Sequence, residues 1–143
     1  MLKILISNFS SNDQRFKYCQ QIRNQVFISE QGVDPNLEMD IYDKTANHYL
    51  LSVNNSPLGT ARWRYTKEGI KLERFAILKE HRNLGYGSKI VLAVLKDVRP
   101  FNKCIYLNSQ LNALFFYQNL GFEIKGSCFE EAGIKHYKMV FKD

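Results

Sequence analysis

The segment 72–88 limits the possible folds of this sequence most strongly. The apolar-rich stretch Leu72–Ile77 is followed, after a short gap, by Arg82-Asn83-Leu84-Gly85-Tyr86-Gly87-Ser88. The pattern predicts a strand, a loop and a turn that opens a helix. Backbone N–H groups at a helix N-terminus are unpaired and, together with the helix dipole, attract anions. We therefore expect a phosphate-binding loop, in which an arginine adds a planar cation and glycines allow close approach to the main chain. Its members would be Arg82, Leu84, Gly85, Tyr86, Gly87 and Ser88.

The glycine spacing narrows the kind of loop. Dinucleotide folds use Gly-x-Gly-x-x-Gly and P-loops use Gly-x-x-x-x-Gly-Lys-Ser/Thr, and neither pattern occurs in this sequence. An Arg-x-x-Gly-x-Gly pattern alone also fits an ordinary surface loop before a glycine-rich helix start. The rest of the chain has to separate these two interpretations.

Length and composition limit the class of protein. The 143 residues predict a single domain, 1–143, and a hydrophobic content of 45% suffices for a packed core. No run of about 18 apolar residues occurs, and the apolar stretch at the N-terminus is too short for a signal peptide. We expect a cytoplasmic protein without a membrane partner.

Charge and cysteine usage limit the partners. The net charge of +6 and the pI of about 9.2 fit either an anionic cofactor or nucleic acid. Because the basic residues are scattered along the chain, we expect no nucleic-acid partner. Cys19, Cys104 and Cys128 are widely spaced and odd in number, which predicts neither a metal site nor disulfides. Cys19 and Cys104 fall in apolar stretches, so we expect both in the core.

Hydrophobic periodicity predicts alternating helices and strands. A capping-box pattern at Ser11 predicts a helix that runs to about Glu30. A second helix follows the glycines and ends before Pro100, and a third, around Leu114, is closed by Gly121. The predicted strands are the stretch 1–7 and the ranges 48–53, 58–65, 70–78, 104–107, 122–125 and 136–141. This order predicts an α/β layered fold with a mixed sheet.

Sequence blocks on both sides of the glycine loop resemble the GNAT acetyltransferase superfamily. Arg82-x-x-Gly85-x-Gly87 is similar to its acyl-CoA loop, and Glu73–Ile77 resembles the strand whose backbone pairs with pantetheine. Gln110-x-x-Ala113-x-x-Phe116-Tyr117-x-x-x-Gly121-Phe122 resembles its second motif, although many relatives carry Asn at the position of Gln110. Blocks spanning 23–48 and 131–139 are similar to the ElaA-like branch, and the second also resembles glucosamine-phosphate acetyltransferases.

The resemblance implies a GNAT-like three-layer fold, with a central mixed, mostly antiparallel sheet flanked by helices. The sheet would splay between the strands that contain Ala76 and Leu107. It also implies acetyl-CoA as co-substrate, with pyrophosphate at the glycine loop, a hydrogen bond from Gln110, and pantetheine along the backbone of Phe75, Ala76 and Ile77. The amine would attack the thioester directly, without an acyl-enzyme.

Tyr117 is the candidate catalytic acid. The thiolate of CoA needs a proton as it leaves, and a phenol with a pKa of about 10 can supply one. The resembling enzymes use the tyrosine at this position in that role. The alternative is an aromatic core residue beside Phe115 and Phe116.

Glu73 is the candidate base for the amine, directly or through water, particularly if burial raises its pKa. The alternative is an ion pair with Lys71 on a solvated strand. Strict strand alternation places Glu73 on one face with Lys71, Phe75 and Ile77, and Arg74 on the other.

Further charged residues lie near the expected acceptor side. The acidic cluster Glu30, Glu38, Asp40 and Asp43, with His48, would recognise a cationic amine or, for His48, assist acid–base chemistry. Loop capping and solvation are the alternative, and no Asp-x-Asp-x-Asp-Gly calcium loop is present. Arg62 and Arg64 share a predicted strand face that would hold an anionic group of the acceptor, unless it is a solvated face. His136 matches the resembling tail, with its role open.

The sequence thus predicts an N-acetyltransferase that moves an acetyl group from acetyl-CoA to a primary amine of a small molecule or peptide. One alternative is an acyl-homoserine-lactone-synthase-like acyltransferase, which the block 23–43 and Gly59-Thr60-Ala61-Arg62 also resemble. A CoA-binding module without catalysis and a basic nucleic-acid-binding domain are the others. Edge strands of such a sheet are compatible with a homodimer.

Overall fold

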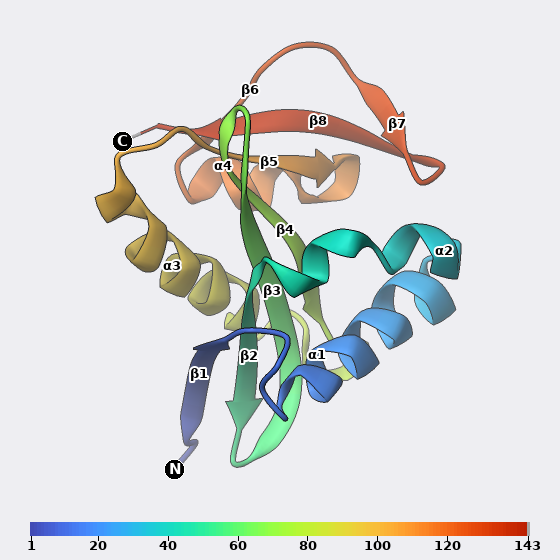
Figure 1. Ribbon diagram of the computed structural model, residues 1–143, viewed down its shortest axis with the longest axis vertical. Coiled ribbons are helices and arrows are strands. Elements are labelled where there is room, and N and C mark those ends of the chain that lie inside the picture. The colour runs from blue at the N-terminus through green and yellow to red at the C-terminus, as the bar shows by residue number, and fades with distance from the viewer. Residues whose placement is uncertain (143) are drawn as a thin grey trace.

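One sheet runs through the molecule, and helices cover both of its faces (Figure 1). The computed structural model describes residues 1–142. Strands follow the order β1-β2-β3-β4-β5-β8-β6, with β7 on β8, and every pair is antiparallel except β4 with β5. The predicted mixed, mostly antiparallel sheet is therefore confirmed. The strands are β1 (Ile4–Phe9), β2 (Asn47–Val53), β3 (Ser56–Thr66), β4 (Gly69–Ile77), β5 (Ile105–Gln110), β6 (Phe122–Ile124), β7 (Phe129–Glu131) and β8 (Ile134–Phe141).

The helices divide between the two faces. In Figure 1, α1 and α2 lie on one side of β2–β4, and α3 lies on the other. No helix among residues 1–142 is long and apolar enough to cross a membrane. The α-helices are α1 (Phe16–Arg23), α2 (Pro35–Glu38), α3 (Tyr86–Val98) and α4 (Leu114–Asn119). A π-helix, η1 (Asn24–Glu30), continues α1, and four 3-10 turns are η2 (Ile41–Lys44), η3 (Lys79–His81), η4 (Arg99–Phe101) and η5 (Leu111–Ala113).

Each face of the sheet buries its own apolar cluster. The larger cluster packs the strands against α3 and α4, with Leu72, Val91 and Leu107 at its centre. The smaller one packs α1 and η1 against the sheet and includes Cys19 and Ala76. Burial on both faces explains why β2 and β3 are buried along most of their length rather than alternating.

A bulge in β4 changes which side chains share a face. Thr60 pairs with Ala76 and Arg62 pairs with Glu73, so Arg74 and Phe75 together stand opposite one residue of β3. Arg74 adopts a left-handed φ of 58° to make this turn. The face prediction based on strict alternation is therefore wrong. Before the bulge, Lys71 and Glu73 share a face and contact each other, whereas after it Phe75 and Ile77 pack into the opposite, α3-side cluster.

Three local predictions are also corrected. The capping box at Ser11 is wrong, because α1 begins at Phe16 after a turn in which the Asp13 carboxylate accepts the Arg15 N–H at 2.9 Å. Cys19 is buried as predicted, but Cys104 is exposed, since β5 begins one residue later. The short strand β7 was not predicted; its turn into β8 places Ala132 at a φ of 53°, for which alanine gives no sequence signal.

The parallel pair at the centre of the sheet separates after three residues. β4 and β5 pair only between Ile70–Leu72 and Ile105–Leu107. Both strands continue beyond this point, β4 to Ile77 and β5 to Gln110, without pairing to each other. The predicted splay between the strands of Ala76 and Leu107 is present, and it leaves backbone groups of both strands open to a ligand.

Candidate functional site

A cavity of about 970 Å³ occupies the opening between β4 and β5. Its walls come from the ends of these strands, the start of α3, α4, β8 and the η1–α2 connection. Its volume lies at the upper end of the range for small-molecule and cofactor sites. Nearly all the site residues predicted from the sequence line it: Glu73, Phe75, Ala76, Ile77, Arg82, Gly85, Tyr86, Gly87, Ser88, Gln110 and Tyr117. Leu84 is 61% exposed and does not line the cavity.

The two glycines of the loop are needed for different reasons. Gly85 is the N-cap of α3, with a φ of 87°, a conformation that side chains with a Cβ rarely adopt. A Cβ on Gly87 would lie 3.3 Å from Cζ of Phe116, so this glycine lets α3 pack closely on α4. Tyr86 points into the core, and only its backbone is available to a ligand. The first residues of α3 line the cavity, which is the position that a phosphate-binding turn requires.

Two consecutive residues at the end of η1 hold the side chains predicted to bind the cofactor. Arg82 donates to Glu30 through both terminal nitrogens, at 2.5 and 2.7 Å, and its Nε donates to the Ile77 carbonyl at 2.9 Å. The next residue, Gln31, exchanges amide hydrogen bonds with Gln110 at 3.0 and 3.4 Å. The end of the π-helix therefore bridges to both sides of the opening, from the glycine loop to the end of β5.

Tyr117 reaches the cavity from α4. Its ring packs against Phe75, Phe116 and Phe122, with centroid distances of 6.0, 5.0 and 5.9 Å. Burial raises the pKa of the Tyr117 hydroxyl, which therefore remains protonated at neutral pH. The aromatic packing and the cavity position occur together, so the core alternative and the functional one are not exclusive.

Glu73 is a buried carboxylate surrounded by cations. It accepts from Arg62 Nε and Arg64 Nε, both at 2.8 Å, and Lys71 Nζ lies 3.4 Å away. Desolvation would raise the pKa of Glu73, but Arg62 and the other two cations outweigh it, and the pKa is lowered. The raised pKa that would favour Glu73 as a base is therefore absent, and Glu73 is an ionised carboxylate at neutral pH.

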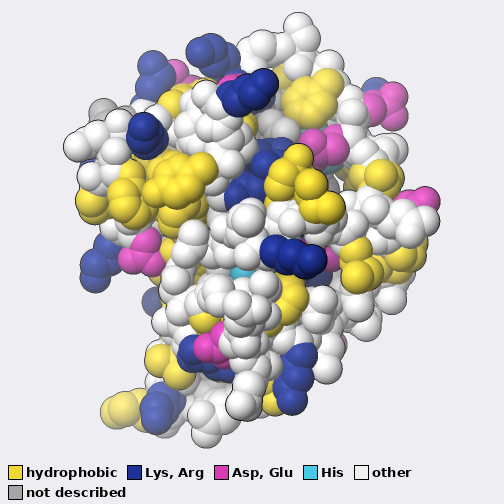
Figure 2. Space-filling model, in the orientation of Figure 1, with side chains coloured by type: hydrophobic (Ala, Val, Ile, Leu, Met, Phe, Trp, Pro, Cys, Tyr) yellow, Lys and Arg dark blue, Asp and Glu magenta, His cyan; other side chains and the backbone are white. Residues whose placement is uncertain are grey.

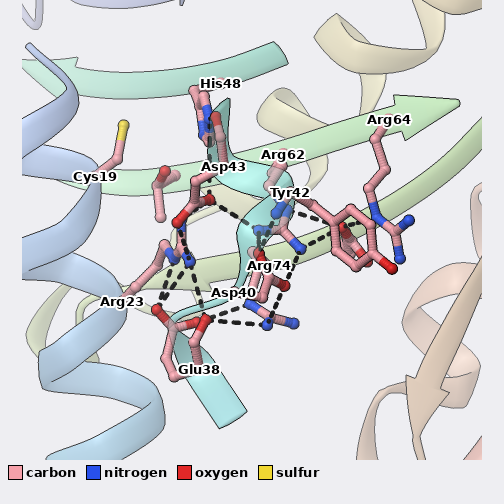
Figure 3. A network of polar contacts seen from close by, with 12 residues as sticks. Cys19, Arg23, Glu38, Asp40, Tyr42, Asp43, His48, Arg62, Arg64 and Arg74 are labelled. Atoms are coloured by element: carbon pink, nitrogen blue, oxygen red, sulfur yellow. Dashed lines mark hydrogen bonds and ion pairs between the residues drawn. The ribbon is translucent and has the colours of Figure 1, made fainter. Parts of the chain in front are cut away.

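Arginines form ion pairs with the acidic residues that the sequence predicts near the acceptor side (Figure 3). Glu38 accepts from Arg23 at 2.9 Å, and Asp43 accepts from Arg23 and Arg62 at 2.8 Å each. The predicted recognition of a cationic amine by Glu38, Asp40 and Asp43 is therefore contradicted.

Asp40 and Arg74 complete this network. Asp40 accepts two hydrogen bonds from Arg62, at 2.8 and 2.9 Å, and one from Arg74 at 3.2 Å. Asp40 also caps η2 through the Tyr42 N–H, as the loop-capping alternative proposed. Arg74 Nε lies 2.7 Å from Glu38 Oε2, as a close ion contact without hydrogen-bond alignment. The network ties the α1–β2 connection to the sheet.

His48 has no access to the cavity. The ring is 1% exposed, packs on Phe16 at 4.6 Å, and its Nε2 lies 2.9 Å from the Asp43 carbonyl. The acid–base role considered for His48 is therefore contradicted. His136, by contrast, lines the cavity, with Nδ1 2.7 Å from the Ile134 carbonyl.

Arg62 and Arg64 share a face, as predicted, but their environments differ. Arg62 is 1% exposed and bound to three carboxylates, so the predicted solvated sheet face is wrong at this residue. Arg64 lines the cavity, and its guanidinium stacks on Tyr42 at 3.8 Å. Sequence reasoning missed Lys71 and Arg74 as cavity residues, because the β4 bulge that orients Arg74 has no pattern in the sequence.

Comparison with known proteins identifies the family. Residues 12–142 match the sequence model of the acetyltransferase (GNAT) domain. The chain belongs to the GNAT acetyltransferase family. An uncharacterized N-acetyltransferase of Bacillus subtilis (strain 168), YjcF, is 32% identical to this acetyltransferase over 133 residues, which is 92% of this chain and 95% of that protein. The resemblance inferred from the sequence motifs is thus confirmed, and the chain is an acyltransferase.

Solved structures show the same fold. Escherichia coli ElaA superposes with a TM-score of 0.88 and 23% identity, covering 98% of this chain and all of that one (100%). A GNAT acetyltransferase from Elizabethkingia anophelis, crystallised with acetyl-CoA bound, has a TM-score of 0.64 and 18% identity, covering 96% and 94% of the two chains. Among the described residues of our acetyltransferase, no group of three or more His, Cys, Asp or Glu is placed to hold a metal ion.

Proposed function

We propose that this acetyltransferase uses acetyl-CoA as its donor and acetylates a primary amine of a small molecule or peptide by direct attack. The observation that carries this proposal is the continuity of the cavity, which runs from the turn before α3, through the opening between β4 and β5, to Tyr117. Family membership and the acetyl-CoA bound in the Elizabethkingia anophelis structure support the choice of donor.

The donor groups along the cavity fit the parts of CoA. Arg82 and the N–H groups of Gly85–Ser88 would hold the pyrophosphate, as cation and helix N-terminus. The backbone of Phe75, Ala76 and Ile77 pairs with β3 on one side only, and its other side would bind the amides of pantetheine, because β5 no longer pairs with β4 at this point. Gln110 would hydrogen-bond the pantetheine arm after releasing Gln31. Acetyl-CoA supplies an activated thioester, and Tyr117 and Glu73 would take part in the proton transfers.

Tyr117 is the proposed acid in this mechanism. Its hydroxyl has no hydrogen-bonding partner among the described residues, and it stays protonated because burial raises its pKa. As the amine nitrogen bonds to the thioester carbonyl carbon, the C–S bond breaks and the sulfur takes the electron pair. Tyr117 would then donate its proton to that sulfur, which stabilises the leaving group at the moment charge develops.

Glu73 lines the cavity where β4 and β5 separate, but its lowered pKa changes its proposed role. A carboxylate held ionised by three cations is a weak proton acceptor. We therefore propose that Glu73 orients the neutral amine or a water beside it, and that water carries the amine proton away. A direct base role would instead make kcat depend on the ionisation of Glu73.

Two measurements test the proposed function. Calorimetric titration with acetyl-CoA should show one binding site per chain, and no binding at millimolar ligand would contradict the donor assignment. A panel of amines, amino sugars and peptides, followed by release of free CoA thiol, should then yield at least one acceptor. Binding of acetyl-CoA without turnover of any amine would favour a CoA-binding module instead.

A further inference from the structure

We propose that the acceptor amine carries an anionic group, a carboxylate or a phosphate, and that Arg64 and Lys71 bind this group in the cavity. This inference rests on the proposed acetyl transfer and names the chemical class of its second substrate. Neither the family nor the comparisons assign it.

Arg64 and Lys71 form one cationic pair on the sheet. They stand opposite each other in the β3–β4 register, so their side chains leave the same face of the sheet. Both line the cavity, with side chains only 16% and 17% exposed. They are therefore partly desolvated cations directed into a cavity, unlike the basic residues interspersed with acidic ones over the outer surface (Figure 2).

Nearby carboxylates do not fully neutralise the positive charge of this pair. The network contains five cations, Arg23, Arg62, Arg64, Lys71 and Arg74, against four carboxylates, Glu38, Asp40, Asp43 and Glu73. Three carboxylates are bound by the arginines at the α1 end, so the excess positive charge lies at the other end. There, Arg64 and Lys71 have one carboxylate between them, Glu73, which Arg62 also uses.

The guanidinium of Arg64 has unused hydrogen-bond donors, and its plane is held in one orientation. Figure 3 shows it at the end of the network, beside the ring of Tyr42. Its Nε is bound to Glu73, whereas its two terminal nitrogens have no protein partner among residues 1–142. Stacking on the ring fixes the guanidinium orientation before a ligand arrives. A planar pair of N–H donors matches the two oxygens of a carboxylate or phosphate, with Lys71 as a second point charge.

The pair lies at the end of the cavity where the acetyl group should be. Arg82 and the glycine loop follow the end of β4 at Ile77, and Lys71 lies six positions before Ile77 on that strand, about 20 Å away at a strand rise of about 3.3 Å. Lys71 and Leu72 pair with β5 at the point where the opening begins. Tyr117 approaches from the α4 side, and the cationic pair lies on the opposite face. An acceptor anchored there would present its amine to the thioester from the side away from the proton donor.

A purely cationic acceptor fits this end less well. The carboxylates nearest to it are already paired with arginines or, for Glu73, with three cations. Glu131 and His136 also line the cavity, from β7 and β8, and lie 3.8 Å apart, whereas Glu73 beside the pair is the group proposed to orient the amine. The arrangement favours an acceptor with an amine at one end and an anion at the other.

Matched acceptor pairs test the proposal. Thiol release would be measured with 4-aminobutyrate against butylamine, O-phosphoethanolamine against ethanolamine, and an amino-acid and amino-sugar-phosphate panel against neutral analogues. At saturating acetyl-CoA, kcat/KM should favour the anionic member in at least one series by about ten- to a hundredfold, the value of one or two charge-assisted hydrogen bonds. The two series distinguish a carboxylate from a phosphate as the recognised group.

Variants then test whether Arg64 and Lys71 cause the preference for anionic acceptors. Arg64→Gln and Lys71→Gln should each reduce the anion preference about tenfold through the acceptor KM, while calorimetric acetyl-CoA affinity stays unchanged. Arg64→Lys and Lys71→Arg should restore part of it. Lys138→Gln is the matched control, because Lys138 pairs with Glu68 and does not line the cavity; its preference should equal that of the wild type.

The possible outcomes separate this proposal from the acetyl transfer itself. Turnover of neutral or cationic amines with no preference for anionic partners would overturn it and leave the proposed function intact. An equal loss of preference in Lys138→Gln would overturn the site and indicate the general field of the protein. Absence of both acetyl-CoA binding and thiol release would overturn the proposed function, and this inference with it.

Discussion

The proposed chemistry depends most on Tyr117, whose phenol stays protonated until it donates to the departing thiolate. Tyr117→Phe removes only the hydroxyl and keeps the ring contacts with Phe75, Phe116 and Phe122. We expect kcat to fall roughly a hundredfold, the usual contribution of a positioned general acid, with acetyl-CoA affinity within about twofold of wild type. Assays of CoA thiol release measure kcat, and calorimetry measures the acetyl-CoA affinity. Equal turnover in the variant would remove Tyr117 from the mechanism.

A variant of Glu73 can show whether this residue is a base or an orienting group, because the two roles predict different kinetics. Glu73→Gln keeps the shape and one acceptor oxygen for Arg62 and Arg64 but removes the charge. Since the lowered pKa makes Glu73 a weak base, we expect the acceptor KM to rise several-fold and the shape of the kcat–pH profile to stay the same. A large loss of kcat together with the disappearance of an ascending pH limb would instead restore the base role.

Among the elements, the π-helix η1 ends at Glu30, which pairs with Arg82, and the next residue, Gln31, pairs with Gln110; both partners are proposed to bind the cofactor. Glu30 neutralises Arg82, and in the proposed complex the pyrophosphate of acyl-CoA would have to displace it. Glu30→Gln should therefore lower the Kd for CoA about two- to fivefold, the value of a partly exposed ion pair that no longer has to be broken. Calorimetry at two salt concentrations measures it.

The neighbouring Glu80 provides the control for this prediction. Glu80 lies near Arg82 in η3 without an ion pair to it, so Glu80→Gln changes the same charge without freeing the guanidinium. Its effect on the Kd should be smaller than that of Glu30→Gln. Weaker CoA binding in Glu30→Gln would mean that the carboxylate positions Arg82 for the ligand rather than competing with it.

The elements also show what the sequence can predict. The strands, α3 and the separation of β4 from β5 follow from periodicity, the glycine turn and the resemblance, because those features are local or shared by the family. The bulge at Arg74 is different, since an arginine at positive φ has no favourable local signal and is fixed by pairing with β3. One bulge moved Phe75 and Ile77 to the opposite face and turned Arg74 toward the network.

At the scale of the whole molecule, charge pairing was the least predictable property. Asp40, Asp43 and Arg23 look like solvated residues in sequence, yet Asp43 pairs with Arg23 across 20 positions and Asp40 pairs with Arg62 across 22. Burial makes their pairing obligatory, because an unpaired charge at Arg23 or Arg62 would be strongly destabilising. The candidate site was predictable where it used backbone and glycine, and unpredictable where it used side-chain charges from separate elements.

This network makes the stability of the whole chain depend on pH in two steps. Burial lowers the pKa of His48 from its usual 6.5, so the unfolded chain takes up this proton at higher pH than the folded one, and stability should fall as pH drops below about 6.5. Arginines lower the pKa of Asp40, Asp43 and Glu73, so a second loss should begin below about pH 4.5, where the unfolded chain protonates first.

Thermal unfolding between pH 8 and pH 3 measures both steps. We expect Tm to be constant from pH 8 to 7, lower by roughly 5 °C at pH 5, and to fall steeply below pH 4.5. In His48→Gln, which keeps an N–H donor for the Asp43 carbonyl, the first step should disappear and the second should remain. A Tm that does not change between pH 7 and pH 5 in the wild type would mean that His48 titrates in the folded protein as it does in the unfolded chain.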